Sequence, residues 1–251
     1  MLADRTIVIT GAGRGLGRAF AEACATANAR RIIIAEIDRE TGAAAAASLS
    51  ALGHDAQFLP VDLGDPHSID AFGAAVAASC DSIDGLVNNG AIATGIGGKT
   101  FEEIDYPTFD RVMAVNVRGT WLMTRALAPL LRKSRAGGRI VNVASDTALW
   151  GAPRLLHYVA SKGAVIAMTR SLARELGADC ITVNAIAPGL VVVEATHYVP
   201  AERHQLYVDG RAIQRQQFPQ DVTGAVVFLL GASAGFITGQ VLPVNGGFVF
   251  N

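Results

Sequence analysis

The chain has 251 residues, of which 51% are hydrophobic and 17% charged, and its formal net charge is −1. This balance excludes the basic surface that nucleic acids or anionic membranes require, and the apolar share excludes a disordered chain. The three cysteines form no close pair in the sequence. We therefore expect neither a disulfide framework nor a cysteine-based metal site, and we predict a cytoplasmic protein without a bound metal.

The two ends of the sequence raise the question of a membrane segment. The start, Met1–Arg5, lacks the basic region and long apolar stretch of a signal peptide. No charged residue follows Asp221, but several glycines, Pro243 and Asn245 divide this apolar stretch. We expect a buried helix and strand here rather than a membrane helix.

Apolar runs rich in Ile and Val alternate with alanine-rich stretches that favour helices. The predicted strands are Thr6–Thr10, Arg31–Ala35, Ala56–Val61, Gly85–Asn88, Arg139–Val143, Ile181–Ala187 and Gln240–Val244. The predicted helices are Leu16–Thr26, Glu40–Leu52, Ser68–Ser79, Tyr106–Lys133, Leu156–Leu176 and Gln220–Leu230. The alternation predicts an α/β fold over residues 1–251: a single-domain, Rossmann-type, doubly wound parallel sheet of about seven strands with helices on both faces.

A glycine cluster joins the first predicted strand to the first predicted helix. Gly11, Gly15 and Gly17 permit a tight turn that lets the backbone approach a pyrophosphate, with Arg14 and Leu16 between them. The free N–H groups at the start of the helix favour an anion there. This context of strand, turn and helix predicts a dinucleotide site.

The acidic residue that ends the second strand bears on the choice of cofactor. Glu36 lies where a carboxylate accepts hydrogen bonds from the adenosine ribose and repels a 2′-phosphate. We therefore predict NAD as the cofactor. NADP stays open as the alternative because Arg14 or Arg39 could meet a phosphate.

Tyr158 and Lys162 are four residues apart on a predicted helix and therefore share a face. A neighbouring ammonium favours the phenolate, so we expect Lys162 to lower the pKa of Tyr158 toward the range that acid–base catalysis uses. Ser145 follows the fifth strand, at the sheet edge where ligands bind in such folds. Its hydroxyl is predicted to hold the substrate oxygen beside Tyr158.

The spacing Gly-x3-Gly-x-Gly, together with Tyr158-x3-Lys162 and the upstream Ser145, resembles the short-chain dehydrogenase/reductase family over essentially the whole chain. The resemblance implies that Asp62 and Leu63 contact the adenine. It places Asn89 in a turn, Asn88-Asn89-Gly90-Ala91, whose last two residues are exchanged relative to the family pattern.

The resemblance also covers the middle helix and the segment after the sixth strand. It implies that Asn116 holds a water connected to Lys162. Pro188, Gly189 and Val191 match the turn that covers the nicotinamide, whereas Val193 stands where the family commonly has threonine. Family members are commonly homotetramers, so we expect a homotetramer or, failing that, a homodimer.

The substrate is predicted to contact Ser145, Thr147 and Tyr158 below a lid segment, residues 191–217. An apolar pocket is expected to be lined by Leu149, Trp150, Leu190 and Val193. This pocket favours a partly hydrophobic secondary alcohol or ketone. Asp146 and Glu194 leave a sugar or polyol open.

The sequence thus predicts an oxidoreductase that transfers a hydride between NAD(H) and a medium-sized secondary alcohol or ketone, with Tyr158 as general acid and base. One alternative is an NADPH-dependent 3-ketoacyl carrier-protein reductase, for which Arg135 and Arg174 could meet an acidic carrier. Another is a dinucleotide-binding protein that has lost catalysis.

Overall fold

Seven parallel strands form the sheet of the computed structural model, which describes residues 1–250. They are β1 (Thr6–Thr10), β2 (Arg31–Glu36), β3 (Ala56–Pro60), β4 (Gly85–Asn88), β5 (Arg139–Val143), β6 (Thr182–Pro188) and β7 (Val241–Val244). Their order is β3-β2-β1-β4-β5-β6-β7, so the winding direction reverses between β1 and β4. This order confirms the predicted doubly wound fold.

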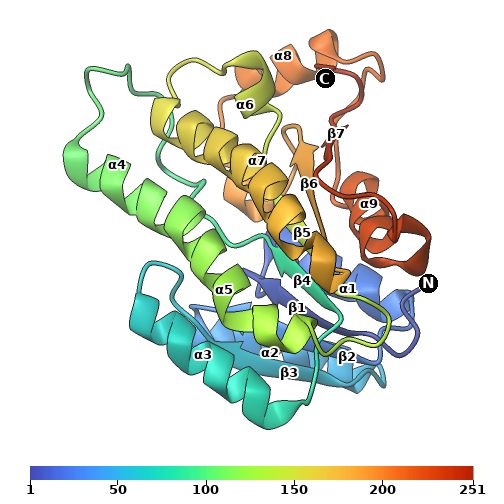
Figure 1. Cartoon of the computed structure of the whole chain (residues 1–251). Coiled ribbons are helices and arrows are strands. Elements are labelled where there is room, and N and C mark those ends of the chain that lie inside the picture. Colours follow the sequence, from blue (N-terminus) through green and yellow to red (C-terminus); the bar gives the residue numbers. More distant parts are fainter. Residues whose placement is uncertain (251) are drawn as a thin grey trace.

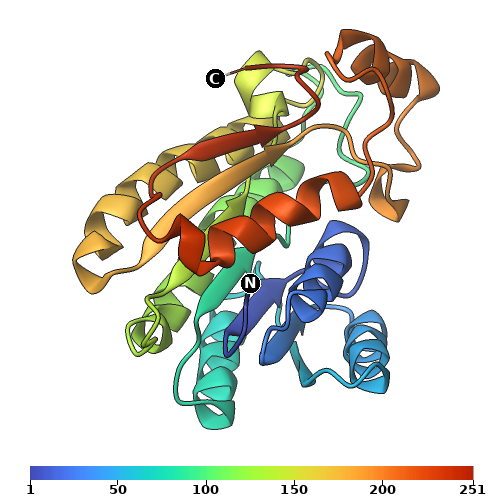
Figure 2. The same ribbon diagram turned by 90° about the vertical axis from the view of Figure 1, so that its right-hand side faces the viewer.

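Helices cover both faces of the sheet (Figures 1 and 2). One face carries α1 (Gly15–Thr26), α2 (Arg39–Ala51) and α9 (Gln220–Leu230). The other face carries α3 (Pro66–Ser79), α4 (Tyr106–Met113), α5 (Thr120–Leu131) and α7 (Leu156–Leu176). Two further helices, α6 (Thr147–Trp150) and α8 (Ala201–Gly210), lie beyond the carboxyl ends of the strands.

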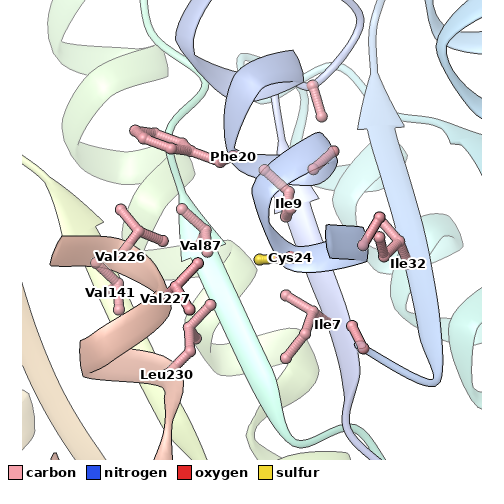
Figure 3. Packing of buried hydrophobic residues seen from close by; sticks show 14 of the residues in the cluster. Ile7, Ile9, Phe20, Cys24, Ile32, Val87, Val141, Val226, Val227 and Leu230 are labelled. Carbon is pink, nitrogen blue, oxygen red and sulfur yellow. The ribbon is translucent and has the colours of Figure 1, made fainter. Parts of the chain in front are cut away.

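The alternation of side chains along β1 explains why both faces need a cover. Ile7 and Ile9 pack with Phe20 of α1 and Val226 of α9, as Figure 3 shows. Val8, between them, points into the second core beneath α3, α5 and α7. All three β1 residues are fully buried. A parallel strand that is buried on both faces has a continuous run of apolar residues in its sequence. The predicted ends of the strands therefore agree with the structure to within one residue.

The predicted helix Tyr106–Lys133 is wrong as a single α-helix. A π-helical turn, Ala114–Gly119, separates α4 from α5. Within this stretch the Thr120 hydroxyl donates to the Asn116 carbonyl at 2.8 Å. A π-helical turn contains about one residue more than an α-helical turn. The apolar pattern of the sequence therefore still predicts a helix, although different side chains face inward.

The segment 191–217 contains short helices, as predicted. Its ends meet in an isolated bridge between Val191 and Gln217. Between them lie a 3₁₀ turn, Glu194–Thr196, and helix α8. Across residues 1–250 we found no helix whose length and apolar character would let it span a bilayer.

Candidate active site

The glycine turn after β1 is built around close backbone contacts. Gly11 and Gly15 have φ angles of +62° and +56°, which favour glycine. A Cβ on Gly17 would lie 2.0 Å from the Gly11 carbonyl oxygen, so no side chain fits there. No side chain caps the start of α1. The first N–H groups of the helix are therefore available to an anion.

Asn89 supports this turn from the neighbouring strand β4. Its Nδ2 donates to the carbonyls of Thr10 at 2.9 Å and Gly11 at 3.1 Å. The Thr10 hydroxyl accepts from the backbone N–H groups of Asn89 and Gly90, both at 2.9 Å. Asn89 is predicted to contact the cofactor. Its side-chain amide donates its hydrogen bonds to the glycine turn and holds that turn in place.

The exchanged Gly90-Ala91 pair fits this geometry. A Cβ on Gly90 would lie 2.7 Å from Leu63 Cδ1, so glycine leaves room for the Leu63 side chain at the position where the family has alanine. Ala91 is absent from the residues of the described chain that have a positive φ. Alanine therefore replaces the family's glycine there without backbone strain.

Glu36 occupies the far side of the glycine turn and is almost fully buried. One carboxylate oxygen accepts from Gly13 N at 3.0 Å, and the other from Ile37 N at 2.9 Å and Asp38 N at 3.3 Å. Asp62, beyond β3, accepts from Gly64 N at 2.7 Å. These backbone contacts fix both carboxylates at the rim of one cavity.

Tyr158 and Lys162 meet at the opposite end of that cavity. The Lys162 Nζ lies 5.6 Å from the centroid of the Tyr158 ring and donates to the Val143 carbonyl at 2.7 Å. The Ser145 hydroxyl accepts from the Thr147 hydroxyl at 2.9 Å and interacts with the Tyr158 phenol. The shared helix face predicted from the sequence therefore brings the three groups together.

The predicted direction of the Tyr158 pKa is wrong, because the folded structure raises this pKa. Burial raises the pKa of Tyr158 to about 12, against the opposing effect of the Ser145 hydrogen bond. Burial also lowers the pKa of Lys162 to about 8. Loss of water around the two groups disfavours both charged forms, the phenolate of Tyr158 and the ammonium of Lys162.

Asn116 lies in the π-helical turn and is buried. Its side chain accepts from Ile92 N at 2.8 Å and donates to Ile92 O and Ser161 Oγ, both at 3.1 Å. Ser161 Oγ donates in turn to the Tyr158 carbonyl at 2.7 Å. Asn116 therefore joins the loop after β4 to the helix that carries Tyr158 and Lys162.

One cavity of about 810 Å³ contains both the glycine turn and the Tyr158 side chain. It lies at the carboxyl ends of the strands, where the winding direction reverses. Every residue predicted to bind cofactor or substrate lines it, apart from Leu149 and Trp150. This position and these groups fit a dinucleotide whose pyrophosphate rests on α1 and whose reactive end faces Tyr158, which defines an α/β dinucleotide-binding enzyme.

The predicted place of Trp150 in the pocket wall is wrong. Helix α6 turns the indole behind the cavity, where its Nε1 donates to Tyr207 OH at 3.4 Å. Trp150 and Tyr207 also pack edge-on, and Phe248 stacks on Tyr207 at 4.3 Å between ring centroids. Leu149 does not line the cavity either and packs on the core beside β6.

The cavity wall at this end comes from residues that the sequence did not single out as a pocket. They are Leu155, Tyr198, Val199, Arg203 and Tyr207. All of them except Leu155 lie in the predicted lid segment, residues 191–217, and that prediction is the signal for them in the sequence.

Asp146, which follows Ser145, is fully buried. Its Oδ1 accepts from Tyr207 OH at 2.9 Å, while Oδ2 has no hydrogen-bond partner within the described chain. Burial raises the pKa of this carboxyl to about 6, opposed by the hydrogen bond from Tyr207 and the charge of Arg211. The lid helix α8 is thereby tied to the loop of Ser145.

Comparison with known proteins agrees with this site. The model of a family described as enoyl-(acyl carrier protein) reductase matches residues 11–249. Galactitol 2-dehydrogenase of Agrobacterium fabrum is 36% identical over 98% of each chain. The 3-oxoacyl-(acyl-carrier-protein) reductase of Aquifex aeolicus is 33% identical, also over 98% of each chain. The solved structure of levodione reductase shares a TM-score of 0.87 and 27% identity over 98% of each chain.

The chain therefore belongs to the short-chain dehydrogenase/reductase family. It is an oxidoreductase that acts on the CH–OH group of alcohols or on the corresponding ketones, and its cofactor is a nicotinamide dinucleotide.

Proposed function

We propose that the chain is an NAD-dependent dehydrogenase or reductase of secondary alcohols and ketones in which Tyr158 is the acid–base group. The observation that carries this proposal is one continuous cavity with the glycine turn of α1 at one end and Tyr158, Lys162 and Ser145 at the other. The cofactor brings the hydride chemistry, and the protein supplies position and proton transfer.

In the proposed reaction, the proton and the hydride that leave the alcohol each have an acceptor. In oxidation, Tyr158 as the phenolate would take the O–H proton of the alcohol, and a nicotinamide held in this cavity would supply the acceptor for the carbinol hydride, so that a carbonyl would be left. In reduction, the Tyr158 phenol donates its proton to the carbonyl oxygen. Ser145 would hold that oxygen. Lys162, whose ammonium donates to the Val143 carbonyl, would hold the nicotinamide ribose. Asn116 positions the helix of Tyr158 through Ser161.

The surroundings of Glu36 support NAD over NADP. Three backbone N–H groups hold its carboxylate, so it cannot readily turn away from a 2′-phosphate. Arg39 is exposed and does not line the cavity. Arg14 does line it, at the glycine turn, and is the remaining cation that could receive a phosphate.

Turnover of a panel of secondary alcohols with NAD and NADP, read at 340 nm, tests the proposal. We expect kcat/KM to be at least about tenfold higher with NAD, and the Tyr158→Phe variant to lose at least about a hundredfold in kcat while binding NADH normally. Tyr106→Phe, at an exposed tyrosine of α4, is the matched control. An active Tyr158→Phe variant would exclude this role for Tyr158, and a preference for NADP would exclude the cofactor assignment.

A reductase of 3-oxoacyl carrier-protein thioesters is the second candidate. The Aquifex aeolicus relative carries that name and supports it. Acetoacetyl thioesters with NADPH therefore belong in the same panel. Efficient reduction of these thioesters, without oxidation of simple alcohols, would favour this candidate.

The apolar side chains around the substrate end support a partly hydrophobic substrate, and the galactitol dehydrogenase relative keeps a polyol in the panel. We also propose a homotetramer, with a homodimer as the alternative. Cys24, Cys80 and Cys180 are all unpaired, which suits the reducing cytoplasm as the place of action.

A further inference from the structure

Two side chains on the inner face of α8 line the cavity beside the Ser145 loop. Arg203 and Tyr207 are four residues apart, so they project from the same side of the helix. Tyr207 is buried and bonds to Asp146, the residue next to Ser145. Arg203, one turn earlier, therefore lies at the end of the cavity where the substrate is bound, away from the glycine turn.

Arg203 is held in place there by the loop that follows Ser145. Its guanidinium carbon lies 5.5 Å from the centroid of the Trp150 ring. Its Nη2 donates to the Pro153 carbonyl at 3.2 Å. Trp150 is itself fixed by its contacts with Tyr207 and Phe248. The guanidinium of Arg203 is thus held against the cavity wall by these contacts, although its side chain is only half-buried.

The charge of Arg203 is not balanced within residues 1–250. No carboxylate of this part of the chain lies within 4.0 Å of it, whereas Arg18, Arg132 and Arg215 each pair with one. Leu155 and Val199, which line the same cavity, are uncharged, and Glu194 of the same wall forms no ion pair with Arg203 within 4.0 Å. The one hydrogen bond to Pro153 leaves most of the guanidinium donors free.

The guanidinium of Arg203, which has no carboxylate partner in the described chain and lies beside apolar side chains, is suited to binding a small anion. Its planar donors match a carboxylate or another small oxyanion, and the low-dielectric wall strengthens that attraction. A neutral polyol would gain little from a fixed cation without acceptors around it. The geometry points to a substrate whose reacting carbonyl or carbinol meets Ser145 and Tyr158 and whose far end carries a carboxylate that binds Arg203. This inference rests on the proposed function because it assigns the substrate class of the same site.

Arg203 would bind the substrate without touching the reacting atoms, so it is a specificity-determining residue. Contacts of that kind contribute equally to the bound substrate and to the transition state. Replacing Arg203 should therefore raise KM or Kd for acidic substrates and leave kcat nearly unchanged.

Calorimetric titration of the NAD-loaded protein, which cannot reduce an oxo acid, tests this directly. The probes are oxo acids of increasing chain length, such as 4-oxopentanoate, each paired with its neutral amide. We expect at least one acid to bind roughly tenfold more tightly than its amide. Arg203→Gln should abolish that preference, and Arg203→Lys should restore part of it. Arg174→Gln, which removes an exposed arginine near the end of α7, is the control for net charge and should keep the preference.

Two results would overturn the inference: no acid preferred over its amide in the wild-type protein, or an unchanged preference in Arg203→Gln. The affinity for NAD, measured in the same samples, reports on the proposed function separately. Loss of acid preference with intact NAD binding rejects the anionic substrate alone. Failure to bind NAD rejects the dinucleotide enzyme.

Discussion

At the scale of single residues, burial moves the pKa values of the Tyr158 phenol and the Lys162 ammonium in opposite directions. A phenol with a pKa of about 12 stays protonated at neutral pH. It is then ready to donate a proton to a carbonyl but must first lose that proton before it can accept one from an alcohol. The two directions of the reaction therefore need different protonation states of the same side chain.

This difference predicts opposite pH profiles. The kcat/KM for alcohol oxidation should rise with pH, because the phenolate fraction grows about tenfold per pH unit below the pKa. The kcat/KM for ketone reduction should hold steady through neutral pH and fall only in alkaline solution. Measuring both directions from about pH 6 to about pH 10 with one substrate pair checks this. An oxidation profile that is flat or falls with pH would contradict the phenol as the titrating group.

The buried carboxyl group of Asp146 should make the stability of the fold depend on pH. Its folded-state pKa of about 6 lies above the ordinary value of 3.8. The protonated carboxyl therefore stabilises the fold below about pH 4, and this contribution is lost as the pH rises through about 6. Asp146→Asn should become more stable than the wild type as the pH rises, by up to about 3 kcal/mol at neutral pH.

Urea unfolding at several pH values measures that difference. Asp209→Asn, at an exposed carboxylate of the same helix α8 that carries Tyr207, is the control and should show no such trend. A stability difference for Asp146→Asn that does not change with pH would show that the Asp146 carboxyl titrates normally.

At the scale of elements, the join between β1 and α1 depends on the absence of side chains. The backbone of Gly11 lies so close to Gly17 that a methyl group cannot fit between them. Asn89 closes the same turn from β4. Because the turn both shapes the fold and carries the anion site, one substitution should damage stability and cofactor affinity together.

We predict that Gly17→Ala lowers the free energy of unfolding by about 1–3 kcal/mol through overpacking. It should also weaken NADH binding at least about tenfold. Gly224→Ala, in the exposed middle of α9 where an added Cβ meets nothing within 4 Å, should stabilise the protein by about 0.5–1 kcal/mol. Thermal unfolding and NADH fluorescence give the two readouts. Unchanged NADH affinity in Gly17→Ala would separate this turn from cofactor binding.

At the scale of the whole molecule, large apolar side chains are exposed on the face formed by α4, α5 and α7 (Figure 1). Tyr106 is 87% exposed, Trp121 45% and Leu156 50%. A second group, Phe236 and Leu242, is exposed near β7. Exposed apolar groups on two separate faces agree with the two contacts that a tetramer of twofold symmetry needs.

Sedimentation equilibrium should therefore show a tetramer at micromolar concentration. The double substitution Trp121→Glu and Leu156→Glu should shift the protein to a smaller assembly, because it would place two charges inside a buried contact. Leu52→Glu, at an exposed leucine after α2, should leave the assembly unchanged. A wild-type protein that sediments as a monomer would contradict the proposed assembly.

The sequence predicts the strands and the cavity residues well because both follow from local patterns. Buried parallel strands read as apolar runs, and the glycine turn and the Tyr158–Lys162 pair each lie within a few residues. The π-helical turn around Asn116 leaves no mark on the apolar period. The burial of Asp146 depends on Tyr207, 61 residues away, and the direction of the Tyr158 pKa depends on how much water the folded wall excludes. Such features need the tertiary structure.

The last residues that the structure describes reach back to the catalytic loop. Arg211 donates to the Asn245 and Leu190 carbonyls at 3.0 and 2.9 Å, and Phe248 stacks on Tyr207, the partner of Asp146. An affinity tag at the carboxyl terminus, or deletion of Phe248, would therefore disturb the substrate wall without touching any catalytic group. Recombinant preparations intended for kinetics are better tagged at the amino terminus.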